Sequence, residues 1–282
     1  ESPTLRINQH CKELVAKGRH IYKLGLGQSP FPVPDSVVNA LRLYAPQKDY
    51  LHVQGLTELR KAVADFHRKK DGVDILPSNV IIGPGSKELL FLLQMVFEGE
   101  LIIPSPSWVS YLPQAKIIGN TIHVLHTKPE EQWRLMPEQL DAFCKENNKA
   151  GNKNYLLILN YPGNPDGITY SKESIEQLAE TARRNNIYIL SDEIYGQLHH
   201  EGNHVSIAKF YPEGTIISSG LSKLCGAGGW RLGTFSFPSK SNPENVPSAP
   251  RSIEIVRRIS FLPATSPKAS TRTLGYPDSM AH

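Results

Sequence analysis

Lys223 and Arg231 stand in one glycine-rich segment, SSGLSKLCGAGGWRLG, directly after a short apolar run. A lysine amine condenses with aldehydes to form a Schiff base, and an arginine donates paired hydrogen bonds to a phosphate. The two residues together predict a site for an aldehyde that also carries a phosphate group. The alternative is an ordinary solvated lysine, and the rest of the chain must decide between the two.

Polar segments after two other apolar runs supply further candidate groups. NYPGNPDG contains Asn164, and SDEIYGQ contains Asp192 and Tyr195. Open α/β sheets bind their ligands at the carboxyl ends of parallel strands, so we expect these side chains to lie beside Lys223. A carboxylate there can pair with a protonated ring nitrogen, although Asp after a strand is also common as a turn or cap residue.

The segment GPGSK predicts an anion site, because it leads from an apolar run into a helical pattern. Backbone amides near Ser86 and Lys87 would face an anion at the start of that helix. The segment is not a nucleotide-binding P-loop, since GxxxxGK[ST] is absent. Ser222 and Arg231 would complete the phosphate site.

Together these segments resemble the class I/II aminotransferases, pyridoxal 5'-phosphate (PLP) enzymes of fold type I, over about residues 20–238. The resemblance implies that Lys223 forms the Schiff base and moves the substrate proton, with Asp192 and Tyr195 as the other catalytic residues. The family's NPTG turn reads NPDG here, with Asp166 in place of threonine. The implied cofactor-binding residues are Ser86, Lys87, Trp108, Asn164, Asp192, Tyr195, Ser222, Lys223, Arg231 and Tyr50.

Three of the implied roles come from the family's pattern alone. Trp108, in PSPSWVSY, matches the aromatic residue that stacks on the cofactor ring. Gly27 matches a loop that closes over the substrate, which Asn164 also contacts. Tyr50 matches a tyrosine that reaches the phosphate of a neighbouring subunit, so the resemblance implies a homodimer with shared active sites.

The implied reaction is transfer of an amino group from an L-amino acid to a 2-oxo acid, within amino acid metabolism. Aspartate, alanine, aromatic amino acids and kynurenine all remain candidate donors. A PLP-dependent C–S β-lyase on the same fold would use the same cofactor residues. A truncated PLP-binding protein with little activity is a third possibility, because no arginine after residue 238 stands in a context that matches the family's carboxylate-binding arginine.

Hydrophobic periodicity predicts an α/β fold with a three-layer α/β/α arrangement and a mostly parallel sheet. Helical spacing runs through Leu59–Phe66 and Ile175–Ala182, with Thr57 and Ser171 at the expected N-caps. KELLFLLQMVF, at 87–97, is apolar nearly all round, as expected for a helix buried between the sheet and a neighbour. The expected strands are 80–82, 101–103, 155–159, 187–190 and 215–217.

Three regions follow from these patterns. We expect an N-terminal arm and part of a small domain at 1–30, a PLP-binding large domain at 31–238, and a poorly ordered Pro/Ser-rich tail at 239–282 that is unlike the family. The small domain would then be incomplete. A fragment, a truncated isoform or a product with an aberrant C-terminus would each explain this pattern.

Composition restricts the partners and the compartment. The 282 residues include 31 basic and 27 acidic side chains, a net charge of +4 without the basic clusters that nucleic acids or membranes require. The three cysteines have neither metal-site spacing nor an even count, which favours a reducing compartment. We therefore expect a cytoplasmic protein without metal, nucleic acid or membrane partners. An organelle address stays open because the chain begins at Glu1 without an initiator methionine.

Overall fold

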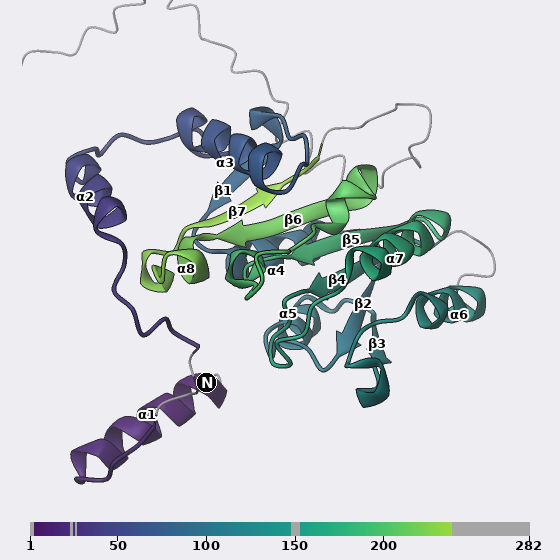
Figure 1. Cartoon of the computed structure of the whole chain (residues 1–282), viewed down its shortest axis with the longest axis horizontal. Helices are drawn as coiled ribbons and strands as arrows, with labels where there is room; N and C mark the ends of the chain where they lie inside the picture. Colours follow the sequence, from purple (N-terminus) through teal and green to yellow (C-terminus); the bar gives the residue numbers. More distant parts are fainter. Residues whose placement is uncertain (1–2, 23–24, 26, 148–152, 239–282) are drawn as a thin grey trace, which may run out of the picture.

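Short aliphatic and β-branched runs form a seven-stranded sheet in the computed structural model, which describes residues 3–22, 25, 27–147 and 153–238 (Figure 1). The strand order is β1-β7-β6-β5-β4-β2-β3. Neighbouring strands from β3 to β6 are parallel, and β7 is antiparallel to both β6 and β1. The strands are β1 Val80–Gly83, β2 Glu100–Ser105, β3 Ile122–His126, β4 Tyr155–Asn160, β5 Ile187–Asp192, β6 Thr215–Gly220 and β7 Gly233–Ser236.

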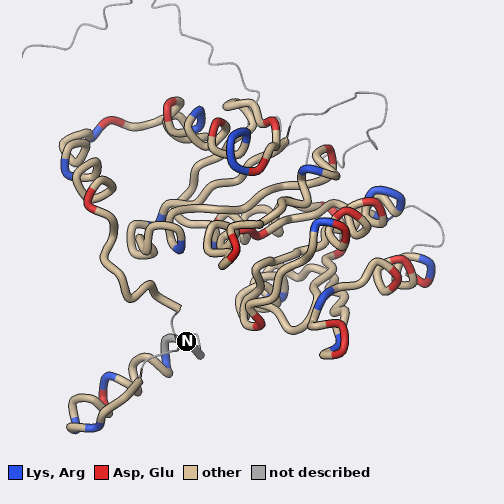
Figure 2. Tube along the Cα trace, in the orientation of Figure 1, with Lys and Arg blue, Asp and Glu red and all other residues tan. Residues whose placement is uncertain are grey.

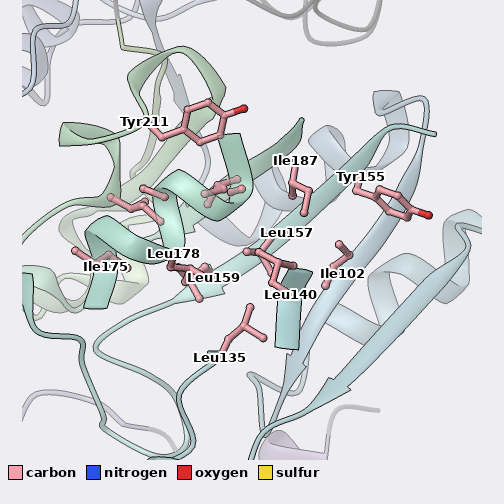
Figure 3. Close-up of a cluster of buried hydrophobic side chains, with 14 of the residues drawn as sticks. Ile102, Leu135, Leu140, Tyr155, Leu157, Leu159, Ile175, Leu178, Ile187 and Tyr211 are labelled. Carbon is pink, nitrogen blue, oxygen red and sulfur yellow. The ribbon is translucent and has the colours of Figure 1, made fainter. Parts of the chain in front are cut away.

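Helices cover both faces of this sheet, which confirms the predicted three-layer α/β/α class. Alternate strand residues point to opposite faces, so Leu156 and Ile158 of β4 pack with α4 and α5, whereas Leu157 and Leu159 pack with α6 and α7. Figure 3 shows the second of these clusters. The helices are α1 Pro3–Ala16, α2 Asp35–Tyr44, α3 Thr57–Lys70, α4 Ser86–Val96, α5 Tyr111–Ile118, α6 Pro137–Asn147, α7 Lys172–Arg184 and α8 Leu221–Leu224.

Two helix starts test the predicted N-caps. Ser171 caps α7 as expected, since its hydroxyl accepts a 3.2 Å hydrogen bond from the backbone N–H of Ser174. The prediction for Thr57 is wrong, because α3 already begins at Thr57 and Leu56 occupies the N-cap. The Thr57 hydroxyl instead accepts a 3.1 Å hydrogen bond from the guanidinium of Arg60.

The apolar helix α4 has one buried face and one exposed face. Leu90 and Leu93 face the sheet and are buried, but Leu92 is 44% and Met95 is 52% exposed. The helix packs one face on the sheet and on α5. Its outer apolar face is open in this single chain.

The carboxyl ends of β1, β2, β4, β5 and β6 lie along one edge of the sheet. Because β7 runs the opposite way, its first residue, Gly233, pairs with the last residues of both β1 and β6, Gly83 and Gly220. The loops that carry the predicted chemistry therefore meet at this edge. Charges of both signs are interspersed over the helices around the sheet (Figure 2).

The regional boundaries predicted from the sequence remain predictions. Residues 239–282 lie outside the described residues. Within the described part of the chain, no helix is long and apolar enough to cross a membrane. No group of histidine, cysteine and acidic side chains suited to a metal ion occurs among those same residues.

Candidate active site

A cavity of about 460 Å³ opens at the edge where the parallel strands end. It receives side chains from loops that are far apart in the sequence, as the strand order requires. All but one of the predicted site residues line it, namely Gly27, Ser86, Lys87, Trp108, Asn164, Asp192, Tyr195, Ser222, Lys223 and Arg231.

Lys223 lies in α8, the single helical turn that follows β6. Its Nζ donates a 2.9 Å hydrogen bond to the backbone oxygen of Gly27 and lies 5.4 Å from the ring centre of Tyr195. Its amine thus sits between the N-terminal segment and the turn after β5. A lysine amine held in a cavity wall, with a carbonyl as its hydrogen-bond partner, is placed to react with an aldehyde bound in the cavity.

Asp192 ends β5 and is only 3% exposed. The hydroxyl of Tyr111 donates a 2.7 Å hydrogen bond to its Oδ2, and the side-chain amide of Asn160 donates to its backbone oxygen at 2.8 Å. Burial raises the pKa of Asp192 to about 6, even though the bonds from Tyr111 and the Ile194 N–H act in the opposite direction. An ionised Asp192 therefore gains from a cation in the cavity, such as a protonated ring nitrogen.

The NPDG turn places Asn164 against Tyr195. The Asn164 side-chain amide donates to the Tyr195 hydroxyl at 3.3 Å, and its backbone N–H donates to Oδ1 of Asn160 at 2.9 Å. Asp166 accepts a 3.1 Å bond from the backbone N–H of Ile168, and burial raises its pKa. Asp166 therefore closes the turn with its own carboxylate, so the departure from the family's NPTG leaves Asn164 at the cavity.

An anion receptor forms where α4 begins. The N–H groups of Ser86 and Lys87 open this helix directly after Gly85, which has the left-handed φ of 97° that favours glycine. The guanidinium of Arg231 lies against Gly85, since a Cβ there would come within 2.0 Å of Nη2. Arg231 itself has a φ of 56° and donates to the Gly228 oxygen at 2.7 Å. A strained non-glycine backbone at such a position is typical of functional sites, and a helix start beside a guanidinium suits a phosphate.

Aromatic side chains form the wall beside these polar groups. Trp108 packs edge-to-face on Tyr111 with ring centres 5.3 Å apart, and Nζ of Lys87 lies 5.7 Å from the Trp108 ring. Tyr111 is a site residue that the sequence analysis missed. Its hydrogen-bond partner Asp192 is 81 residues away, so no local sequence pattern indicates the contact. The one local signal is that Tyr111 stands three residues after Trp108, which was predicted to line the cavity.

Tyr50 is the predicted residue that the structure leaves outside the cavity. Its side chain is fully exposed. The prediction concerned the site of a neighbouring subunit, which one chain does not test. The role of Tyr50 therefore stays a prediction.

The donor set fits PLP. The cavity combines a lysine amine for the aldehyde, an anion receptor for the phosphate, a buried carboxylate for the ring nitrogen and an aromatic wall for the ring. The glycine at position 85 leaves room for Arg231 where any larger residue would displace it. These groups come from four separate segments of the chain, and no single motif contains them.

Comparison with known proteins gives one family. Residues 19–275 match the family model described as aminotransferase class I and II. Aspartate aminotransferase of Bacillus subtilis is 34% identical over 241 residues, and the aspartate/prephenate aminotransferase of Thermus thermophilus is 34% identical over 244 residues; the alignments cover 82% and 85% of this chain. The chain spans only about 60% of the length of these curated relatives. The solved aspartate aminotransferase of Thermus thermophilus with maleate superposes with a TM-score of 0.78 at 31% identity, covering 95% of this chain and 67% of that one.

Proposed function

The chain belongs to the class I and II aminotransferases, and from that membership we propose that it transfers an amino group from an L-amino acid to a 2-oxo acid, with PLP held on Lys223. The observation that carries this proposal is the convergence of Lys223, Asp192 and Arg231 on one cavity. The chain spans only part of its relatives' length, so family membership alone does not establish the activity. The activity is therefore proposed.

Besides Lys223, five groups would hold the cofactor. Arg231, Ser222 and the N-terminal amides of α4 would bind the phosphate, and Trp108 would cover the ring. Asp192 would keep a proton on the ring nitrogen, since its buried carboxylate gains from a cationic partner. When bound, PLP supplies an aldehyde for amino-group exchange and a ring that withdraws electrons from the substrate α-carbon.

Lys223 would act twice. Its Nζ would first bind the aldehyde and then, once released by the substrate amine, move a proton at the substrate α-carbon. Tyr195 and Asn164, which already bond each other at 3.3 Å, would orient the ring oxygen beside that amine. Gly27, whose carbonyl accepts from Nζ, would hold the amine until substrate enters.

Aspartate is the donor we propose first, because the relatives are named for it. The β-lyase alternative has no support among these relatives, which are aminotransferases. A cytoplasmic location stays part of the proposal.

We also propose a homodimer with shared sites. Tyr50 projects fully into solvent and the outer face of α4 exposes Leu92 and Met95. Apolar surface of this kind is typical of surfaces that bind another protein. The family resemblance implies that Tyr50 of one copy would reach the cavity of the other.

A product assay tests the proposal. The chain with PLP is incubated with aspartate, alanine or an aromatic amino acid, with and without 2-oxoglutarate, and Lys223→Ala serves as the inactive control. Glutamate formed only in the presence of the acceptor supports an aminotransferase. Pyruvate and ammonia formed from a cysteine conjugate without acceptor would assign the lyase instead. PLP binding without any product would leave a cofactor-binding protein.

A further inference from the structure

Glu193 directly follows Asp192, points away from the cavity and is 6% exposed. Its Oε1 accepts hydrogen bonds from the hydroxyls of Ser191 and Ser206, both at 2.7 Å. Its Oε2 contacts Nε2 of His204 at 2.8 Å. The carboxylate therefore ties β5 to a loop that lies more than ten residues further along the chain.

His204 completes this link from the other side. Its side chain is 4% exposed, and a Cβ at Gly196 would lie 2.9 Å from its ring, so the imidazole packs directly on the backbone next to Tyr195. The ring of Tyr161, the residue after β4, lies 5.2 Å away. The Tyr161 hydroxyl accepts from the backbone N–H of Ile207 at 2.6 Å.

The contact between Glu193 and His204 joins a carboxylate to an imidazole, and it is an ion pair when His204 is protonated. Burial alone would raise the pKa of Glu193, but the hydrogen bond and charge of His204 and the two serine hydroxyls lower it overall. Burial opposes a proton on His204, yet Glu193 and the charge of Asp71 raise its pKa above the ordinary value. Three donors on one buried carboxylate are the arrangement that an ionised, compensated pair requires.

We propose that Glu193 and His204 are positioning residues that hold the turn after β5, and with it Asp192 and Tyr195, at the cofactor cavity. Two other bonds anchor the turn from outside: the Glu193 N–H bonds the Ser218 oxygen of β6 at 2.9 Å, and the Asn164 amide bonds the Tyr195 hydroxyl at 3.3 Å. The Gly196 and Leu198 N–H groups bond within the turn itself. The ion pair and the packing of His204 on Gly196 connect it to the loop at 204–207. The effect of this pair on PLP binding rests on the proposed function. Its effect on the position of the turn does not.

The pair also has an electrostatic role toward Asp192. The charge of Glu193 raises the pKa of Asp192, and a protonated His204 offsets that charge. Loss of the His204 charge should therefore raise the pKa of Asp192, and loss of the Glu193 charge should lower it. A contact in which His204 is neutral would not give these opposite signs.

The buried pair His67–Asp71 on α3 provides a matched control. Its atoms lie 2.7 Å apart and its side chains are 3% and 5% exposed, close to the values for Glu193 and His204. The pair links His67, near the end of α3, to Asp71, the residue that follows this helix. Among the described residues, the His67 imidazole hydrogen-bonds no residue of the turn after β5. His67→Gln thus removes a similar buried contact on α3, while it keeps the Asp71 charge that acts on His204.

Two measurements on the cofactor-free chain test the proposal. The first is the hydrogen-exchange rate of the amides at 194–198, taken as a ratio to that of the amides of α7. This ratio should rise at least about tenfold in Glu193→Ala, and Glu193→Gln should restore most of the protection. His67→Gln should leave the ratio unchanged. Carbon-13 NMR titration of labelled aspartates, with Asp192→Asn to assign the signal, should show the pKa of Asp192 raised in His204→Gln and lowered in Glu193→Gln.

Each outcome decides the proposal. Unchanged relative exchange at 194–198, or pKa shifts of one sign in both variants, would overturn it. If Glu193→Ala does not fold, the two glutamine variants carry the same titration. A wild-type chain that binds no PLP would remove the proposed function while these two measurements still stand.

Discussion

Asp192→Asn should stabilise the cofactor-free chain at neutral pH, because burial of the carboxylate outweighs the hydrogen bonds that it accepts. The carboxylate is 3% exposed, and burial raises its pKa from the ordinary 3.8 to about 6. A raised folded-state pKa favours the protonated form, so its stabilising contribution is complete below the unfolded pKa and is lost as the pH rises through about 6.

The magnitude follows from these two values. Above pH 7 the shift costs about 3 kcal/mol of unfolding free energy, which a neutral asparagine avoids. At pH 5 the wild-type carboxyl is mostly protonated when folded and recovers about 1.4 kcal/mol of that cost. The advantage of Asp192→Asn over wild type should therefore shrink by about 1.4 kcal/mol between pH 7.5 and pH 5.

Urea unfolding of both proteins at the two pH values provides the assay. Comparing the variant with wild type at each pH cancels the contributions of other titrating groups to the unfolding free energy. Glu100 is one such group, since the Lys153 and His123 side chains lower its pKa although burial acts to raise it. The same substitution should abolish amino-group transfer. A variant that is less stable than wild type at both pH values, with no change in the difference, would refute the account of Asp192.

Arg231→Ala should weaken PLP binding by roughly 30- to 1000-fold in equilibrium dialysis, since it removes one charge-assisted clamp; an unchanged dissociation constant would exclude Arg231 from the phosphate site. Gly85→Ala should weaken it by a similar factor, because its Cβ would displace the guanidinium, and combining the two substitutions should add little; additive losses would contradict this. Tyr111→Phe removes the hydroxyl that donates to Oδ2 of Asp192, so the pKa of Asp192 should rise. In urea unfolding, the pH at which the cofactor-free chain begins to gain stability on acidification should then be higher than in wild type. An unchanged pH dependence would count against that hydrogen bond.

Strand positions and the site were predictable where the signal is local. Every expected strand occurs, because runs such as YLLIL at 155–159 are buried on both faces of the sheet. β3 was missed since its sequence, IHVLH, alternates half-buried with exposed residues at a sheet edge. β7 was missed because only four residues, GTFS, pair there and their position is fixed by β1 and β6 on either side.

Contacts between distant segments were not predictable from one sequence. The sequence around Tyr111 does not indicate that it bonds Asp192. The contact between Glu193 and His204 depends on how the loop that carries His204 folds back to the end of β5. The exposed side of α4 could not be inferred from composition either, because an apolar helix can face a neighbour outside its own chain. The residues that were found share a position directly after a strand, where the parallel sheet brings them to one edge.

Reduction with borohydride in the presence of PLP, followed by peptide mapping, tests the central claim that the cavity holds PLP on Lys223. We predict a visible absorbance band that disappears on reduction and one modified peptide that contains Lys223, with neither in Lys223→Ala. A modification on Lys87, or a folded chain that takes up no PLP, would contradict it.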